Sequence, residues 1–143
     1  MNEITPLENL APNSKRVWSF TIDSILANLI YITIVYDQII LLKTPEEIIN
    51  FAKETSWILA LINILYHTFF TWQNGKTLGK HIMKIKVVMI EDGALLSFSA
   101  SLLRALVRVV DEALFYIGFL PAFFSPTRQT LHDRVSRSVV VNV

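Results

Sequence analysis

The chain has 143 residues, of which 52% are hydrophobic and 17% are charged, and it carries a formal net charge of +1 without a cysteine. This length predicts one domain, and the charged fraction lies well below the roughly 25% of a typical soluble domain. The low net charge excludes a nucleic-acid partner, and the lack of cysteine excludes thiol catalysis, thiolate metal sites and disulfides. So much apolar surface in a small chain predicts an integral membrane protein, because a water-facing shell of this size cannot cover it.

Residues 1–15 form a predicted amino-terminal tail without the basic stretch and apolar run of a cleavable signal peptide. Residues 17–42 then supply an apolar run that exceeds the roughly 20 helical residues needed to cross a bilayer core. This segment is expected to stay in the protein as a signal anchor and to form the first spanning helix. A carboxylate, Asp23, lies inside it.

A polar, amphipathic stretch, residues 45–54, is predicted to form a short surface helix after the first span. A second spanning helix is predicted over residues 56–73, whose apolar run has Trp57 near one end and Trp72 near the other. Tryptophan is enriched at both membrane–water interfaces, so this pair is typical of a helix that crosses the bilayer.

A β-hairpin is predicted over residues 82–97, where a run rich in valine and isoleucine precedes Asp92 and Gly93. An Asp-Gly dipeptide between such runs is typical of a tight hairpin turn. The carboxy-terminal run, residues 138–143, is the other strand-like segment. Because an isolated hairpin is marginally stable in water, this run is expected to pair beside it and complete a small cytoplasmic sheet.

Residues 98–124 are long enough to cross a bilayer but carry Arg104, Arg108, Asp111 and Glu112. On a helix these four positions fall on one stripe, while leucine and valine cover the other side. Two interpretations stay open. The segment is either a tilted spanning helix with a buried ionic stripe or an amphipathic interfacial helix followed by a short re-entrant apolar hairpin.

The distribution of lysine and arginine bears on this choice. Basic residues are concentrated before the first helix, in the loop after the second helix and in the tail, so the positive-inside tendency places all three in the cytoplasm. Termini on one side require an even number of crossings, which favours the re-entrant interpretation. The expected fold is α-helical in the membrane, with two spanning helices, an amphipathic and re-entrant third element, and a small cytoplasmic sheet.

Asp23 is expected to face protein or water rather than lipid, with Arg104 or Arg108 as its partner. Such a pair can be a packing device, or it can tune the carboxylate for binding an ion. In the second helix, His67 shares a face with Asn63. It can hydrogen-bond between helices, or it can relay protons because imidazole titrates near neutral pH.

No cofactor or metal is expected, since one histidine without cysteine or a suitably spaced second histidine makes a poor metal site. Residues 74–80 lack the spacing of a phosphate loop and follow a membrane helix rather than a strand, so the lysines there are expected to contact anionic lipid headgroups. His132 and Asp133 are adjacent and do not indicate a hydrolase triad. No enzymatic activity is predicted.

Several short motifs occur in an order that resembles the RDD family, small bacterial membrane proteins named for one arginine and two aspartates. The motifs are Arg16 with Asp23, TLGK at 77–80, the valine-rich run before EDG at 91–93, Arg104, and LHD at 131–133. The resemblance implies that Arg16 lies at the mouth of the first helix, that Asp23 lies inside it, and that Asp133 is the second aspartate.

The resemblance also implies a bacterial cytoplasmic (inner) membrane location and, as functions, transport of unidentified ligands or sodium/proton exchange. The first hypothesis is a transport-related subunit that moves an ion or small ligand, with cation/proton exchange favoured. The alternative is a non-transporting scaffold, accessory or sensor protein. Two or three crossings hardly enclose an alternating-access path, and no internal repeat is recognised, so transport would require a homo-oligomer in the lipid bilayer. The candidate ion- or ligand-binding residues are Arg16, Asp23, His67, Arg104, Arg108, Asp111 and Asp133.

Overall fold

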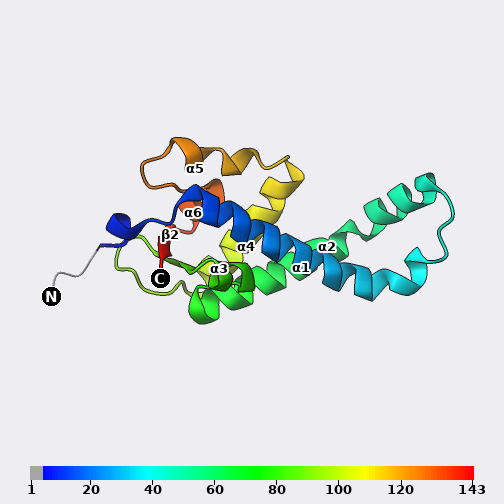
Figure 1. The fold of residues 1–143 in the computed structure, drawn as a ribbon, viewed down its shortest axis with the longest axis horizontal. Helices are drawn as coiled ribbons and strands as arrows, with labels where there is room; N and C mark the ends of the chain where they lie inside the picture. The colour runs from blue at the N-terminus through cyan, green and yellow to red at the C-terminus, as the bar shows by residue number, and fades with distance from the viewer. Residues whose placement is uncertain (1–4) are drawn as a thin grey trace.

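Two long helices form a shaft that projects from the rest of the molecule in the computed structural model, which describes residues 5–143 (Figure 1). They are α1 (Asn13–Ile39) and α2 (Pro45–Asn74), joined by a short turn at the far end of the shaft. At 1.5 Å per residue each helix is about 40 Å long, which exceeds the roughly 30 Å core of a bilayer. Both are long and apolar enough to cross a membrane.

The second helix is longer than predicted. Residues 45–54 and 56–73 belong to one continuous helix rather than to a surface helix and a separate span, because no glycine or proline interrupts them. A capping box between Thr44 and Glu47 fixes where the helix begins. Gly75 ends it with a φ of 72°, a left-handed conformation that favours glycine.

The first helix is Asn13–Ile39 rather than the predicted residues 17–42. Before it, the predicted tail contains regular structure: η1 (Pro6–Asn9) is followed by Leu10, which forms an antiparallel bridge with Val141. Residues 1–4 of that tail lie outside the described residues.

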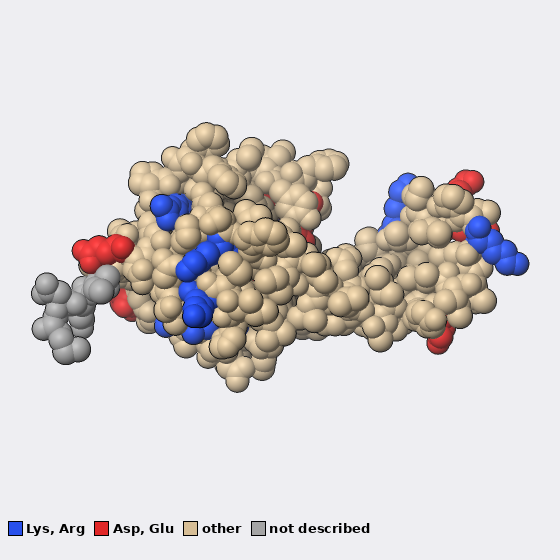
Figure 2. All heavy atoms as spheres, viewed as in Figure 1, with Lys and Arg blue, Asp and Glu red and all other residues tan. Residues whose placement is uncertain are grey.

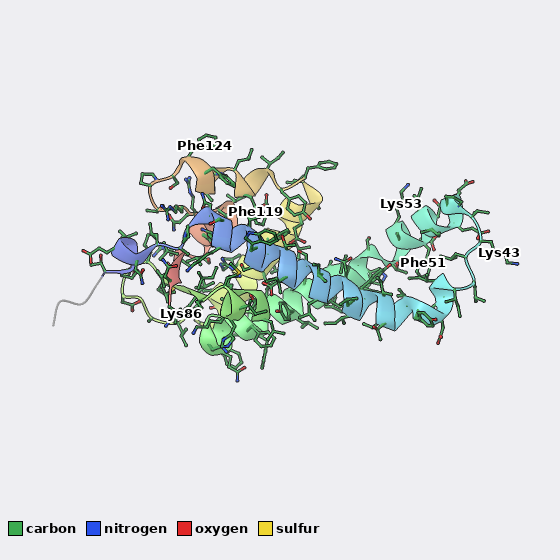
Figure 3. All side chains as sticks on the ribbon, in the orientation of Figure 1. Lys43, Phe51, Lys53, Lys86, Phe119 and Phe124 are labelled. Carbon is green, nitrogen blue, oxygen red and sulfur yellow. The ribbon has the colours of Figure 1, made fainter. Side chains whose placement is uncertain are left out.

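Charged side chains gather at the two ends of the molecule, and Figure 2 shows none along the shaft between them on the face in view. Lys43 and Lys53 lie at the far end of the shaft, whereas Lys86 lies in the globular body at the opposite end (Figure 3). This distribution suits helices whose middle lies in lipid and whose ends meet water. Large apolar side chains exposed along the shaft include Ile25, Leu29, Ile32, Leu61 and Leu65.

A two-stranded antiparallel sheet lies in the globular body, where β1 (Ile85–Met89) pairs with β2 (Ser138–Asn142). The predicted pairing of the carboxy-terminal run is therefore confirmed. Apolar side chains pack on both faces of the sheet and make the core that holds the strands together. One cluster contains Ala11, Ile85, Val87, Leu96 and Val140, and the other contains Val88, Val139 and Val141.

The predicted hairpin over residues 82–97 is wrong. After β1 the chain turns at Gly93, whose φ is 70°, but residues 94–97 form no strand. The physical reason is the start of the next helix: the hydroxyl of Ser97 accepts a hydrogen bond from the backbone N–H of Ala100 and caps that helix directly after the turn.

Helix α4 (Phe98–Ala113) turns its charged stripe inward and its apolar side outward. Arg104, Arg108 and Asp111 are buried on one face, as the predicted stripe requires. The opposite face exposes leucine and valine, an arrangement that suits a helix in contact with lipid. The exposed apolar residues on and directly after this helix are Leu103, Leu106, Val110 and Leu114.

The chain does not continue as a helix beyond α4, which excludes a single spanning helix over residues 98–124. Phe115 and Tyr116 adopt left-handed φ values of 57° and 61°, and η2 (Ile117–Phe119) and α5 (Pro121–Phe124) follow. We call residues 115–124 the excursion. This compact apolar segment has the shape expected of the re-entrant alternative. It folds back against α1, where Phe20 packs edge-on against Tyr116 and Phe119.

The body contains an internal repeat that the sequence analysis did not recognise. Residues 77–89 and 130–142 align without gaps as TLGKHIMKIKVVM and TLHDRVSRSVVVN. Each unit is a threonine-capped helix of five residues followed by a strand of five residues. The first unit is α3 (Leu78–Ile82) with β1, and the second is α6 (Leu131–Val135) with β2.

A local pseudo-two-fold axis relates these two units. The antiparallel register places Val87 opposite Val140, and the same two valines occupy equivalent positions in the repeat. Lys84 and Arg137, also equivalent, precede their strands with left-handed φ values of 54° and 50°. The repeat therefore brings the starts of α3 and α6 toward α1 in related ways.

Candidate functional site

Asp133 is the centre of a buried ionic cluster where α1, α4 and α6 meet. Its fully buried carboxylate forms ion pairs with Arg16 of α1 and Arg104 of α4. It also accepts a hydrogen bond of 3.0 Å from the backbone N–H of Thr130, which completes a capping box at the start of α6. Three of the predicted site residues, far apart in the sequence, thus meet at one point.

The charge of this cluster is stable. Burial alone would raise the pKa of the Asp133 carboxyl, but Arg16 and Arg104 outweigh that effect and hold the pKa well below its usual range. Burial lowers the pKa of the Arg104 guanidinium, and the ion pair with Asp133 opposes this shift. The carboxylate therefore stays ionised at physiological pH and serves as the counter-charge for the buried Arg104 and the partly buried Arg16.

Asp23 occupies a second buried site, on α1, with a different set of partners. One carboxylate oxygen accepts hydrogen bonds from the Tyr66 hydroxyl and the Gly79 backbone N–H, both at 2.8 Å, and the other accepts one from the Thr77 hydroxyl at 2.6 Å. The Tyr66 oxygen in turn accepts a hydrogen bond from the backbone N–H of Leu78 at 2.9 Å. All of these donors are neutral, and they tie the start of α3 to α1 and α2.

Gly79 is required by the close approach of α3 to α1. A Cβ on this residue would lie 2.9 Å from a carboxylate oxygen of Asp23 and would collide with the backbone carbonyl of Ser19. Neither obstacle is the far end of a flexible side chain. This packing explains the glycine of the TLGK motif in physical terms.

Asp23 is 1% exposed, so the prediction that it is sheltered from lipid is confirmed. The prediction that Arg104 or Arg108 pairs with it is wrong: Asp23 forms no ion pair within residues 5–143. The two arginines of α4 are engaged elsewhere, by Asp133 and Glu112, and the close contact at α3 supplies hydrogen-bond donors to Asp23 instead.

Arg108 connects α4 with α2 and with α1. Its Nε donates to a carboxylate oxygen of Glu112 at 3.0 Å, and its Nη1 lies 3.2 Å from His67 Nδ1. A guanidinium can only donate, so Nδ1 is the acceptor and the proton of His67 is on Nε2. The Cζ atom of Arg108 lies 5.0 Å from the centre of the Phe20 ring, a cation–π contact. The proton-relay role of His67 stays a prediction.

Asp111 supports the break after α4. Its carboxylate accepts a hydrogen bond from the backbone N–H of Gly118, where a Cβ would overlap the same carboxylate. The backbone carbonyl of Asp111 accepts a further bond of 2.9 Å from the N–H of Tyr116. Asp111, a predicted site residue, therefore fixes the backbone of the excursion. It does not take part in the ion pairs of Asp133.

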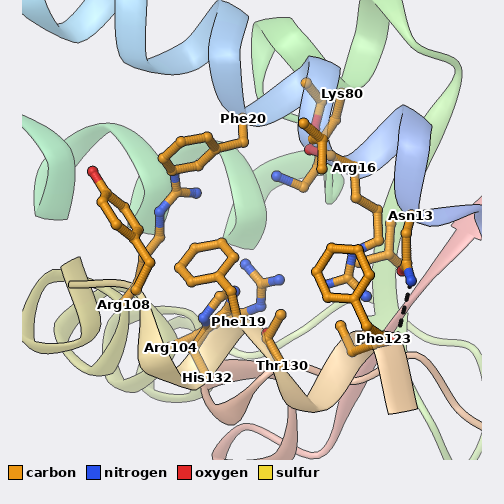
Figure 4. Close-up of a pocket in the computed structure, with 15 residues that line it drawn as sticks. Asn13, Arg16, Phe20, Lys80, Arg104, Arg108, Phe119, Phe123, Thr130 and His132 are labelled. Carbon is orange, nitrogen blue, oxygen red and sulfur yellow. Dashed lines mark hydrogen bonds between the residues drawn. The ribbon is translucent and has the colours of Figure 1, made fainter. Parts of the chain in front are cut away.

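A cavity of about 220 Å³ lies beside these clusters, between α1, α3, α4 and the short segments η2, α5 and α6. Figure 4 shows nitrogen atoms of Lys80 and Arg104 directed toward its interior, with the rings of Phe20, Phe119 and Phe123 around them. None of the lining residues in the described part of the chain is acidic. The basic lining residues are Arg16, Lys80, Arg104 and Arg108.

Lys80 lines the cavity, although the sequence predicted that it contacts lipid headgroups. It is only 6% exposed, and its ammonium group forms no ion pair within residues 5–143. Burial lowers its pKa to about 7; nearby Asp23 opposes this effect, and the arginines Arg104 and Arg108 add to it. The one signal for this placement is the repeat, in which Lys80 occupies the position of Asp133.

Comparison with known proteins identifies a family whose members resemble this chain in sequence. The profile of the RDD family matches residues 10–137. An uncharacterized membrane protein of Bacillus subtilis, YteJ, is 28% identical over 129 residues, which cover 89% of this chain and 77% of that protein. The proline-rich antigen homolog of Mycobacterium tuberculosis is 29% identical over 91 residues, and this match covers 61% of the chain but only 38% of the mycobacterial protein. No solved structure matches the chain.

Proposed function

The chain belongs to the RDD family, and we propose that this membrane protein is a transport-related subunit that binds an anionic ligand in the cavity beside Asp133. The observation that carries the proposal is the cavity lining, which combines four basic side chains with no acidic one among the described residues. The balancing carboxylates lie behind the wall, where hydrogen bonds and ion pairs already engage them. An anion in the cavity would meet basic side chains, of which Lys80 forms no ion pair within residues 5–143.

Unused hydrogen-bond donors support this proposal. Nε of Arg104 and Nη2 of Arg108 are buried without a hydrogen-bond partner among the described residues. These two atoms have almost no accessible surface, so they do not face the cavity directly. A buried donor without a partner loses its hydration and gains nothing in return, so a local shift of either guanidinium toward a bound anion would recover a hydrogen bond. Arginine is suited to this task because its fork of N–H groups matches the oxygens of a carboxylate or phosphate.

Transport would require more than one copy of the chain. Two candidate spans hardly enclose a path with access from both sides, and the repeat lies in the body rather than in the spanning helices. We therefore place the subunit in a homo-oligomer of the bacterial inner membrane, with no enzymatic role. Both termini and the sheet would lie on the cytoplasmic side, because lysine and arginine dominate that end by the positive-inside tendency, while the apolar face of α4 and the excursion would contact lipid.

Cysteine labelling tests this orientation. Cysteines at Asp92 and Asn142 should resist an impermeant thiol reagent in intact cells, whereas a cysteine at Glu47, at the far end of the shaft, should react. Labelling of Asn142→Cys from outside would reverse the proposed topology.

Anion binding is tested on the purified full chain with acetate and inorganic phosphate as probes, measured by titration calorimetry. Lys80→Gln should weaken binding about tenfold, since a hydrogen bond to a charged group contributes about 1.5 kcal/mol. Lys76→Gln is the matched control, because Lys76 lies in the loop directly before α3 and does not line the cavity. Wild-type protein that binds neither probe would contradict the proposal and favour the non-transporting scaffold or sensor.

Cation/proton exchange through Asp23 is the second candidate function. The observation that favours it is a buried carboxylate held by neutral donors, with no arginine to neutralise it. Sodium and proton flux in proteoliposomes separates the two functions. Exchange through Asp23 predicts flux that Asp23→Asn abolishes and Lys80→Gln preserves, whereas the anion-binding function predicts no sodium-dependent proton flux.

A further inference from the structure

We propose that the cavity binds an anionic amphiphile: a single-chain molecule whose carboxylate or phosphate headgroup lies among Lys80, Arg104 and Arg108 while its hydrocarbon tail extends into the lipid. This inference rests on the proposed anion binding and names the class of ligand. Three features of the cavity carry it, namely its divided lining, its size and its rim.

The lining is divided into a cationic part and an aromatic part. Lys80 and Arg104 place nitrogen atoms toward the interior, whereas the Arg108 guanidinium lies over the Phe20 ring (Figure 4). Each of these three basic side chains is at least nine-tenths buried. The aromatic part is preorganised by edge-on ring contacts, with Phe20 packed 5.5 Å from Phe119 between centroids. A small inorganic anion would use the first part only, and an uncharged hydrocarbon would use the second only. The aromatic lining residues are Phe20, Tyr116, Phe119 and Phe123.

The size of the cavity limits what it can enclose. Its volume of about 220 Å³ is below the roughly 300 Å³ of the smallest pockets for drug-sized ligands. A headgroup with the first part of a chain fits such a space, and the rest of a long chain must lie outside. A fully enclosed lipid is therefore excluded.

The rim provides a place for the rest of the chain. Val17 and Phe123 line the cavity and are also 50% and 58% exposed, so the cavity reaches the surface between α1 and α5. The neighbouring surface of the excursion is apolar. Phe124 is not part of the rim, because its side chain does not line the cavity, points away from the body and is 86% exposed (Figure 3). A hydrocarbon tail leaving the cavity would thus meet apolar side chains and lipid rather than water. Other exposed apolar residues of the excursion are Phe115, Ile117 and Leu120.

Equilibrium binding to the full chain in nanodiscs of zwitterionic lipid tests this inference, with empty nanodiscs as the correction for partitioning. The probes are radiolabelled palmitate and hexadecyl phosphate, acetate and inorganic phosphate as anions without a tail, and hexadecanol as a tail without a charge. We expect the long-chain anions to bind at least about 100-fold more tightly than the short ones, since each buried methylene contributes about 0.8 kcal/mol. Hexadecanol should bind at least about tenfold more weakly than palmitate.

Two pairs of variants locate the ligand. Lys80→Gln should weaken palmitate binding about tenfold, and Lys76→Gln should leave it unchanged. Phe123→Ala should weaken palmitate at least about fivefold without changing acetate, because a wall of the tail site is lost, and Phe124→Ala is its exposed neighbour and control.

The outcomes separate this inference from the proposed function. If acetate and palmitate bind with equal affinity, or if Phe123→Ala and Phe124→Ala behave alike, the amphiphile is wrong while anion binding stands. If no anion binds, both proposals fail. If hexadecanol binds as tightly as palmitate, the cationic part of the lining is not used and the inference is overturned.

Discussion

The two aspartates that the structure buries most completely are held by opposite means. Asp23 on α1 accepts hydrogen bonds from neutral groups at the start of α3, whereas Asp133 on α6 is held by two arginines. Both contacts fasten one unit of the internal repeat to α1. In the first unit the carboxylate is on α1, and in the second unit α1 contributes Arg16 to a carboxylate of the unit itself. Arg16, Asp23 and Asp133 therefore make two contacts, here called latches, that join α1 to both halves of the repeat.

The two units of the repeat carry opposite charges at one equivalent position, and this difference determines the charge of the cavity lining. Position four of the repeat is Asp133 in the second unit, where two arginines neutralise its charge, and Lys80 in the first unit, whose ammonium group forms no ion pair among residues 5–143. A pair of identical units would have placed matched charges on both sides. The difference leaves a surplus of positive groups facing the interior, although the molecule as a whole is nearly neutral.

The ionic latch should be the more costly one to break. Asp133→Asn leaves Arg16 and Arg104 buried without a counter-charge, and we expect a loss of about 3–5 kcal/mol in the free energy of unfolding. Denaturant titration of the purified protein in mild detergent measures it. A loss no greater than that of the corresponding change at Asp23 would remove the distinction between the two latches.

Gly79→Ala tests the packing side of the Asp23 latch. The added methyl group must push α3 away from the Ser19 carbonyl and the Asp23 carboxylate, and overpacking of this kind costs about 1–3 kcal/mol. The equivalent residue of the other unit, His132, already carries a large side chain, which shows that the requirement is local to α3. Thermal unfolding of Gly79→Ala at wild-type stability would contradict the close contact.

Asp23→Asn should cost less, about 1–2 kcal/mol, because an asparagine oxygen can still accept from two of the neutral donors and the Thr77 hydroxyl can rotate to accept from its amide. Infrared spectroscopy of the carboxylate band offers an independent readout, since the band of a buried carboxylate held by neutral donors differs from that of an ion pair. A cost equal to that of Asp133→Asn would indicate a charged partner that the structure does not show.

The pH dependence of anion binding should be the smallest of these effects. The pKa of Lys80 is about 7, so its charge, and with it one charged contact to the ligand, is present below pH 7 and is lost as the pH rises above it. Affinity for methanesulfonate, whose own charge is constant in this range, should fall about tenfold between pH 6 and pH 9. Lys80→Gln should make the affinity independent of pH. An affinity that rises with pH would contradict the role of Lys80.

The two long apolar helices could be predicted because their signal is local. The apolar runs of α1 and α2 and the inward stripe of α4 follow from spacing along one segment, and the structure bears out all three. Residues 45–54 were separated from the second span on polarity alone, although a helix continues through polar residues when no breaker is present.

The latches could not be predicted in the same way, because their partners come from distant segments. The motif pointed to Arg16, Asp23 and Asp133, but nothing in the spacing distinguishes Thr77 and Gly79 from the arginines of α4 as partners of Asp23. The internal repeat would have indicated that Lys80 and Asp133 are equivalent, but its two units share only four identical residues in thirteen. The repeat is recognised in the structure by matching helix caps, left-handed residues and strand register. Lys80 was missed for this reason.

The central claim is that the cavity beside Asp133 holds an anion, and locating one tests it most directly. Crystals of the purified protein grown with selenate would reveal the anion by the anomalous scattering of selenium. We expect a peak within hydrogen-bond distance of Lys80, Arg104 and Arg108, and loss of that peak in Lys80→Gln but not in Lys76→Gln. A peak confined to the exposed lysines, with the cavity empty of selenate at saturating concentration, would contradict it.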